Sequence, residues 1–392
     1  MNVQPIDRLD LSDQRVFIRA DFNVPLEDGR VTDDTRIRRT LPTIQHALKE
    51  GAHPLILASH LGRPEGSPRP AYALAPVSRR LSELLGQTVV QAEDCAGTTV
   101  EKQIAAMGRG EVLLLENLRF HPEEKKNDPD FARALARLAD IYINDAFGTA
   151  HRAHASTYGM ASLVSRRGMG FLMQEEIAQL ERLRHDPAAP FLVILGGAKV
   201  AGKIGVIQHL LDRADVFLIG GAMAYTFMRA RDEKTGRSKI ESDEVDLARE
   251  IIEASVEKNV LLLLPTDHVV TANDDSQAAG CVVRQIPENM CGVDIGPRTI
   301  TGYSAEIEKA ATIFWNGPMG IFENEAFATG TRSVARAVAE ASAFSVIGGG
   351  DSVAAVRQFD LSGGIGHIST GGGASLAFLE SRTLPGLDAL AA

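Results

Sequence analysis

The chain has 392 residues, of which 44% are hydrophobic and 23% charged, a globular composition that excludes the disordered and fibrous classes. This length exceeds what one ordinary core supports, so we expect two domains. The formal net charge of -10 argues against nucleic acid as a partner, so an anionic ligand would need a cleft in which Arg and Lys are concentrated.

The N-terminal residues MNVQPIDRLD do not resemble a signal peptide. The longest aliphatic run, VLLLL, is far shorter than the roughly 20 residues that a membrane helix needs. We therefore expect a cytoplasmic protein without a membrane partner. Cys95, Cys281 and Cys291 lack CxxC spacing, which predicts packing residues rather than disulfides or a zinc site.

Short β-rich runs alternate with helical patterns from the first residues onward, as is typical of βαβ units. Strands are predicted in the first half in RVFIRADF, PLILASH, VLLLEN and DIYINDAF. Helices are predicted between them in TLPTIQHALKEG, VSRRLSELLG and DPDFARALARLA, where Leu135 and Leu138 share one face.

The segment GFLMQEEIAQLERLRHD is predicted as a helix that joins the two halves, with no strand beside it before Phe191. Strands follow in FLVILGG, DVFLIGG, NVLLLLPTD, TIFWNGP and FSVIGGG. Helices are predicted in KIGVIQHLLDRA and in SDEVDLAREIIEASVEKN, with Ser242 as N-cap. The fold class is α/β, with two doubly wound, Rossmann-like parallel-sheet domains at residues 1–168 and 188–380 and a joining helix at 169–187.

The residues that follow each strand differ between the halves. Ligands of open parallel sheets bind beyond the carboxyl ends of the strands, so these residues are the candidates for chemistry. The first half presents polar and basic side chains there: Asp21, Asn23, His60, Arg63, Arg119, His151, Arg152 and His154. The second half presents glycines and lysines, which suit phosphates held by backbone N–H groups at helix N-termini. The two halves are therefore predicted to bind different ligands.

The loop GGAKVAGK resembles a P-loop but departs from it at Ile204, where the motif needs Ser or Thr to hold magnesium. We expect its glycines to open a helix near Ala201. Asp351 has two interpretations that can hold together, an N-cap of the helix SVAAVRQF and a carboxylate for the magnesium that Ile204 cannot bind. Arg38 and Arg39 are expected to face solvent.

Motifs along essentially the whole chain resemble those of the phosphoglycerate kinase family, and they occur in that family's order. They are RVFIRADFNVPL, DDTRIRR, ASHLGRP, LLENLRF, NDAFGTAHRAHAST, LGGAKVAGKI, GGAMAYTF, DIGPRT, WNGPMGIFE, IGGGDSVAA and HISTGGGASLAFLE. The resemblance implies reversible phosphoryl transfer from 1,3-bisphosphoglycerate to ADP, giving 3-phosphoglycerate and ATP with Mg²⁺. It also implies a bilobal monomer that bends at a hinge, with residues 381–392 packed on the first domain.

The resemblance also implies a role for each matching residue. In the first domain, Asp21 and Asn23 would meet the hydroxyacid part of the glycerate, and Arg36 would lie at its reacting carboxyl end. The far phosphate would be bound by a basic set: His60, Arg63, Arg119 and Arg152. Arg36 and Lys199 would be the catalytic residues.

In the second domain, Lys203 would hold nucleotide phosphates and Asp351 would support magnesium. Glu323 would bind the ribose and Gly292 would border the adenosine. The phosphates would be lined by the run Gly349, Gly350, Asp351 and Ser352.

Three departures from the family pattern bear on nucleotide affinity rather than on activity: Ala222 for a glycine, Ala201 with Gly202 for a more polar pair, and Ser352 for threonine.

A dinucleotide-dependent oxidoreductase would need GxGxxG spacing, which the glycine loops of the second half lack. A non-catalytic, two-lobed metabolite-binding protein is the alternative, although it has no use for Lys199 together with Lys203.

Overall fold

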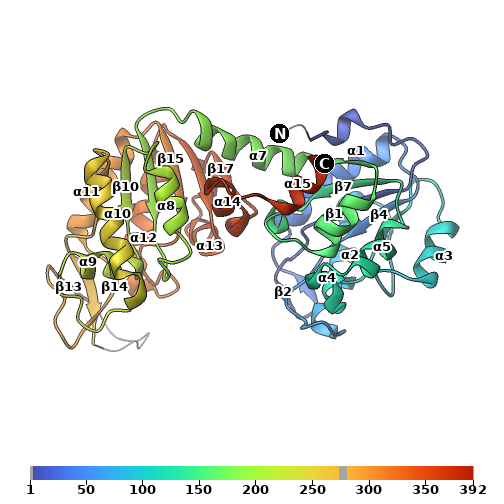
Figure 1. The fold of residues 1–392 in the computed structure, drawn as a ribbon. Coiled ribbons are helices and arrows are strands. Elements are labelled where there is room, and N and C mark those ends of the chain that lie inside the picture. Colours follow the sequence, from blue (N-terminus) through green and yellow to red (C-terminus); the bar gives the residue numbers. More distant parts are fainter. Residues whose placement is uncertain (1–2, 273–279, 392) are drawn as a thin grey trace. The chain divides into compact units, whose positions relative to one another are not determined.

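The computed structural model describes residues 3–272 and 280–391 (Figure 1). The chain forms two compact units. Unit 1 comprises Met1–Ala178 and Thr383–Ala392, and unit 2 comprises Gln179–Arg382. Within the described ranges, no helix has both the length and the apolar character that crossing a membrane requires.

Unit 1 is built on a six-stranded sheet in which all neighbouring strands are parallel. In spatial order its strands are β5 (Val89–Gln91), β6 (Val112–Leu114), β4 (Leu55–Ala58), β1 (Val16–Ala20), β7 (Ile141–Asp145) and β8 (Arg166–Met169). The four central strands are buried at every residue, as expected for a sheet that is covered on both faces. A small antiparallel pair is formed by β2 (Leu26–Glu27) and β3 (Arg30–Val31).

The helices of unit 1 bury apolar stripes against this sheet. Ile37 and Ile44 of α1 and Leu81 of α2 join one core cluster with Ile18 and Leu57 of the strands. The helices are α1 (Thr35–Lys49), α2 (Ala75–Leu85), α3 (Thr98–Ala106), α4 (Pro122–Lys126), α5 (Pro129–Ala136), α6 (Met160–Leu163), the first part of α7 (Phe171–His185), and α15 (Pro385–Ala391). The C-terminal helix α15 is tied to this unit by the hydrogen bond from Gly386 N to Ala150 O, at 2.9 Å.

Unit 2 repeats the architecture with a second six-stranded parallel sheet. In spatial order its strands are β11 (Leu261–Leu263), β10 (Val216–Ile219), β9 (Phe191–Leu195), β15 (Thr312–Asn316), β16 (Phe344–Gly348) and β17 (His367–Ile368). A three-stranded antiparallel sheet is added, formed by β13 (Cys281–Val283), β12 (His268–Thr271) and β14 (Cys291–Ile295).

The core of unit 2 contains the fully buried Trp315 of β15 together with Ile313 and Ile347 of the sheet. Val334 and Val338 of α12 pack into the same cluster. The helices are α8 (Ile204–Leu210), α9 (Met223–Ala230), α10 (Val245–Glu257), α11 (Pro297–Lys309), α12 (Thr329–Glu340), α13 (Gly350–Gln358) and α14 (Gly372–Leu379), besides the remainder of α7.

The predicted α/β fold class with two parallel sheets is confirmed, and a strand lies in each of the predicted runs. Three local predictions are wrong. Ser242 is no N-cap of α10, because it begins a short 3-10 turn and the helix starts at Val245. The helix expected near Ala201 begins at Ile204, after a turn. The joining helix α7 follows the strand β8 directly, so it does have a strand beside it.

Candidate active site

In each unit, the strand order singles out one edge of the sheet. In unit 1 the connection after β1 leads to β4, on one side of β1 in the sheet, whereas the connection after β7 leads to β8, on the opposite side. The direction in which strands are added to the sheet therefore reverses between β1 and β7. In unit 2 it reverses between β9 and β15 in the same way. Ligands of open parallel sheets bind beyond the carboxyl ends of the strands at such a reversal. These two edges are therefore the candidate sites.

At the edge of unit 1, the buried Asp21 connects side chains from other elements. Arg36 of α1 donates from Nη1 to Asp21 Oδ2 at 2.9 Å. Burial, together with nearby arginines including Arg19, holds the pKa of His60 well below its usual value, so the ring is neutral. Arg19 Nη2 lies 3.3 Å from His60 Nδ1, and because a guanidinium only donates, the ring proton is on Nε2. His60 can therefore donate a hydrogen bond from Nε2.

Arg119 follows β6 in the short helix Leu118–Phe120. Its Nη1 donates to Gly62 O at 2.8 Å, and Gly62 N donates to Asn23 Oδ1 at 2.8 Å, so three strand ends are tied together. Its Nε is buried without a hydrogen-bond partner in the described part of the chain. Burial first, and then the charges of Arg19 and Arg152, lower the pKa of Arg119 to about 10. Such repulsion between cations is relieved by a bound anion.

Arg19, the fourth of the five residues of β1, is a site residue that the sequence analysis missed. It is 1% exposed, and its Nε donates to Ser156 Oγ at 2.8 Å. Ser156 in turn donates from Oγ to Oε1 of the buried Glu124 at 2.6 Å and from its backbone N to Oε2 at 2.9 Å. Glu124 thus supplies negative charge beneath the basic cluster. The signal in the sequence that could have identified Arg19 as a site residue is that it is the single charged residue of the apolar run VFIRA.

The remaining arginines of this edge are more exposed. Arg63 and Arg152 are exposed, and Arg152 Nε lies 3.2 Å from His151 Nε2. Arg38 faces solvent as expected, but Arg39 is only partly exposed and pairs with Glu175 at 3.3 Å, so the expectation for Arg39 is wrong.

The edge of unit 2 contains a pocket of about 300 Å³. Its walls are the loops that follow β9, β15 and β16. They contribute Gly197, Ala198, Lys199, Lys203, Asn316, Gly317, Gly349, Gly350, Asp351 and Ser352. The structure thus brings Lys199 and Lys203 together with the run Gly349–Ser352, although these segments are far apart in the sequence.

The backbone of this pocket depends on glycine at the start of α13. Gly349 has a φ of 95°, and a Cβ at this position would lie 3.0 Å from Asn316 Nδ2. The first N–H groups of α13 have no partners within the helix and line the pocket with partial positive charge. Asp351 lies in the first turn and Gly349 occupies the cap position, so the N-cap interpretation of Asp351 is wrong.

Lys203 stands directly before α8 and lines the pocket. Burial lowers the pKa of Lys203, and the carboxylates of Asp351 and Glu241 partly offset this. Glu241 Oε2 also accepts hydrogen bonds from Val200 N at 2.5 Å and from Ala201 N at 3.2 Å, which holds the turn before α8. Lys199 is exposed on the same loop. Glu241 was missed by sequence reasoning, because it approaches from a distant part of the chain.

Asn316 is a third residue that sequence reasoning missed, because it is the last residue of a predicted strand. It lines the pocket, is 4% exposed, and its Nδ2 has no partner among the described residues, so it can donate to a ligand. Ser352 Oγ accepts from Gly317 N at 2.5 Å, so this hydroxyl braces the loop after β15. Glu323 is exposed and Gly292 lies in β14, and neither lines this pocket.

The carboxylate among the pocket-lining residues belongs to Asp351. A single carboxylate beside phosphate-binding groups fits Mg²⁺, which is usually held by one or two carboxylates together with substrate phosphates.

Outside the two edges, Asp94, Cys95 and His121 place ligand atoms within 4.8 Å of one another. Burial raises the pKa of Cys95, and its thiol donates to Glu116 O, so it behaves as the packing residue that was predicted. Cys281 is exposed, which the packing prediction did not anticipate.

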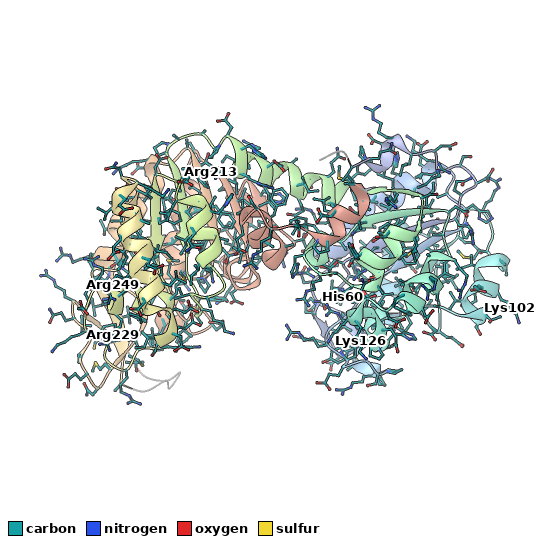
Figure 2. All side chains as sticks on the ribbon, in the orientation of Figure 1. His60, Lys102, Lys126, Arg213, Arg229 and Arg249 are labelled. Carbon is teal, nitrogen blue, oxygen red and sulfur yellow. The ribbon has the colours of Figure 1, made fainter. Side chains whose placement is uncertain are left out.

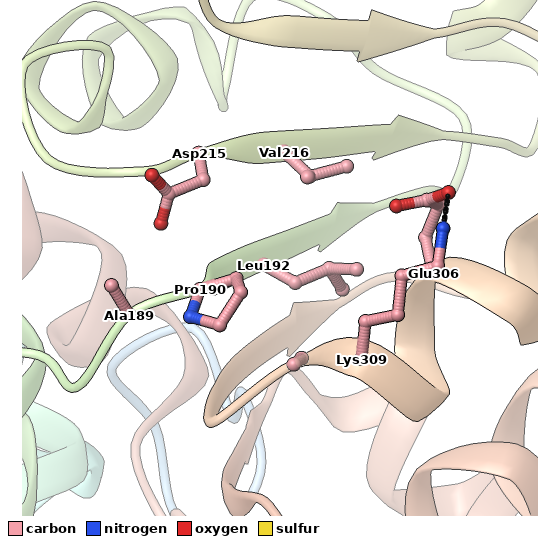
Figure 3. A pocket seen from close by; sticks show the side chains of 8 residues that line it. Ala189, Pro190, Leu192, Asp215, Val216, Glu306 and Lys309 are labelled. Atoms are coloured by element: carbon pink, nitrogen blue, oxygen red, sulfur yellow. Dashed lines mark hydrogen bonds and ion pairs between the residues drawn. The ribbon is translucent and has the colours of Figure 1, made fainter.

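Another hollow, of about 380 Å³, lies where the strands of the unit 2 sheet begin, at the edge opposite the glycine loops (Figure 3). It is lined mainly by small and apolar side chains such as Ala189, Pro190 and Leu192, with the Glu306–Lys309 ion pair at its rim.

Lysines such as Lys102 and Lys126 are exposed, whereas His60 is buried at the edge of the unit 1 sheet (Figure 2). None of these features contributes a charged cluster comparable to the two edges.

Comparisons with known proteins agree along the whole length. The phosphoglycerate kinase family model matches residues 6–382. Phosphoglycerate kinases of Anaeromyxobacter sp. strain K and Moorella thermoacetica are each 54% identical to this chain, over 99% and 97% of both sequences. The solved phosphoglycerate kinase of Coxiella burnetii has a TM-score of 0.88 at 40% identity over 99% of both chains. That of Pyrococcus horikoshii has a TM-score of 0.86 at 36% identity, over 99% of this chain and 98% of the other.

Proposed function

The chain belongs to the phosphoglycerate kinase family, and on that premise we propose that the basic edge of unit 1 binds 3-phosphoglycerate and the glycine-rich pocket of unit 2 binds ADP or ATP. The enzyme is a kinase of glycolysis and gluconeogenesis, which transfers a phosphoryl group reversibly between 1,3-bisphosphoglycerate and ADP. One observation carries the assignment: a single chain presents an arginine cluster at one strand reversal and a lysine and glycine pocket at the other.

In unit 1, we assign the far phosphate of the substrate to His60, Arg63, Arg119 and Arg152. The unpartnered Nε of Arg119 and the donor Nε2 of His60 support this assignment. Asp21 and Asn23 then lie where they can accept from or orient the hydroxyacid part. Arg36 is held by Asp21, and we place it at the carboxyl group that reacts.

In unit 2, the phosphates of the nucleotide are assigned to Lys203 and to the run Gly349, Gly350 and Ser352. Asp351 would hold Mg²⁺, which when bound neutralises charge on the phosphate oxygens. The ribose is assigned to Glu323 and the adenosine border to Gly292, outside the pocket that holds the phosphates.

The chemistry needs no general base. The attacking group in the ATP-consuming direction is a carboxylate, already ionised near neutral pH because its reference pKa is about 4. The residues therefore orient the substrates and compensate the charge that spreads over the transferred oxygens. We assign this task to Arg36 and to Lys199, whose exposed ammonium is free to follow the phosphoryl group.

Because the two substrates bind to different units, the reacting atoms must be brought to within roughly 3 to 3.5 Å of each other. We propose that both substrates together favour a closed state that excludes water, which would hydrolyse the acyl phosphate. The bending segments would be α7 and residues 381–386, between a first domain at 1–168 and a second at 188–380. A radius of gyration by solution scattering that stays unchanged with both substrates would contradict closure.

The proposal also includes a cytoplasmic location and a monomeric state, the latter because the residues assigned to each edge come from a single chain. A coupled assay tests the function as a whole: the protein is mixed with 3-phosphoglycerate and MgATP, and formation of 1,3-bisphosphoglycerate is followed. Turnover that requires both substrates is expected. Binding of both ligands without turnover would instead indicate a non-catalytic, two-lobed metabolite-binding protein.

A further inference from the structure

The loop after β15, residues 317–321, forms a wall of the unit 2 pocket through Gly317 and the adjoining Asn316. Its backbone is held by two neighbouring loops, by α13 and by β14. The hydrogen bonds are Gly197 N to Pro318 O (2.8 Å), Gly221 N to Met319 O (2.9 Å), Gly317 N to Ser352 Oγ (2.5 Å) and Ile321 N to Val293 O (3.0 Å). The position of this wall is therefore set by a small number of buried polar contacts.

The loop's two consecutive amides, Met319 N and Gly320 N, both depend on one side chain. Thr331 Oγ1 accepts from Met319 N at 3.1 Å and from Gly320 N at 3.2 Å, and the threonine is fully buried. Thr331 lies in the first turn of α12, and that turn is anchored because Gly330 N donates to Asp294 Oδ2 at 2.6 Å. The Thr331 side chain thus fixes the position of the loop relative to α12.

We propose that Thr331 is a positioning residue of the nucleotide site: its hydroxyl oxygen fixes the 317–321 loop, and with it Asn316 and Gly317, in the geometry that receives the phosphates. The inference rests on the proposed nucleotide site. Thr331 itself is not among the residues that line the pocket.

Three substitutions separate this role from simple packing. Thr331→Val keeps the shape but removes the acceptor, so the two amides lose their partner or the loop moves to find water. Thr331→Ala removes the acceptor and leaves room for water, and it replaces Thr331→Val if that variant does not purify. Thr331→Ser keeps the oxygen and loses only a methyl group.

Thr299 offers a matched control in the same unit. Its Oγ1 also accepts from two consecutive amides, Thr266 N at 3.0 Å and Asp267 N at 3.2 Å, and it is also buried near the start of a helix, α11. It does not line the pocket and it braces a different loop. The Thr299 hydroxyl also donates to Asp267 Oδ1 at 2.7 Å. Thr299→Val should therefore lower the unfolding temperature at least as much as Thr331→Val without changing nucleotide affinity.

The experiment measures the Kd for MgADP by calorimetry and the KM for MgATP and for 3-phosphoglycerate in each full-length variant. Thr331→Val should raise the nucleotide Kd and KM about tenfold, Thr331→Ser should restore them, and the KM for 3-phosphoglycerate should stay within about twofold. Unchanged nucleotide affinity in Thr331→Val, or an equal loss in Thr299→Val, would overturn the inference.

A further variant separates failure of this inference from failure of the proposed function. Lys203→Met alters the assigned phosphate contact directly. If Lys203→Met weakens MgADP binding while Thr331→Val does not, the pocket stands and the positioning role falls. If Lys203→Met binds MgADP normally, the assignment of the pocket itself is wrong.

Discussion

Arg119 provides a prediction in which stability and function change in opposite directions. Its pKa is lowered to about 10 because it is buried, and because the charges of Arg19 and Arg152 lie nearby. At 1.36 kcal/mol per pKa unit this lowering corresponds to about 3 to 4 kcal/mol of destabilisation at neutral pH, and solvent at the edge of the site reduces it to about 1 to 2 kcal/mol. Arg119→Met removes that cost but also removes the hydrogen bond to Gly62 O, which contributes about 1 kcal/mol.

The free energy of unfolding of Arg119→Met should therefore equal that of the parent or exceed it by up to about 1 kcal/mol. Its KM for 3-phosphoglycerate should rise by about 10-fold to 150-fold, since a charge-assisted hydrogen bond to the substrate is lost. Urea denaturation measures the first quantity and the coupled assay measures the second.

Arg15 gives the matched control, because its pKa is raised by the hydrogen bonds and charge of Asp140 rather than lowered. Arg15→Met breaks the contact of Nη2 with Asp140 Oδ1 at 2.6 Å and should lower stability by up to about 1 kcal/mol without changing the KM. If the free energy of unfolding of Arg119→Met falls by about 2 kcal/mol or more while the KM stays unchanged, the reasoning that this guanidinium binds an anionic substrate is refuted.

Further predictions concern catalysis, magnesium and pH. Lys199→Ala and Arg36→Ala should lower kcat far more than they weaken nucleotide binding, and a change in KM alone would show that their roles are misassigned. Asp351→Asn should raise the Mg²⁺ concentration for half-maximal rate about tenfold, and an unchanged requirement would place the metal elsewhere. Burial and nearby arginines lower the pKa of His154 to about 3, so the unfolded chain binds a proton that the folded chain does not between about pH 6.5 and 3. Stability should accordingly fall less steeply on acidification in His154→Gln, by up to about 1.4 kcal/mol per pH unit in urea titrations, and identical slopes would contradict the buried neutral ring.

The strands that carry the site could be predicted from the sequence because each is a short apolar run ending in polar residues or glycine, as β1 ends before Asp21 and β16 before Gly349. Strands that lack such a run were missed. β8 consists of Arg166–Met169 and is recognisable as a strand only through its pairing with β7.

Arg19 and Glu241 were missed for the same physical reason, which is that their partners lie far away in the sequence. Arg19 is identified by its contacts with Ser156 and His60, and Glu241 by the turn that it holds at Val200. From the sequence alone, Arg19 is predicted only as part of a strand, and Glu241 only as a solvent-exposed carboxylate. Conversely, Asp351 is placed in the pocket as expected from its position behind the glycines, but the helix that it joins begins one residue before it.

Calorimetric binding of each substrate to one variant of each edge tests the central assignment most directly. The account predicts that Arg119→Met loses affinity for 3-phosphoglycerate but binds MgADP like the parent, whereas Lys203→Met shows the reverse. If the two substitutions affect the same ligand, or if Lys203→Met weakens 3-phosphoglycerate alone, the division of the substrates between the two edges is contradicted.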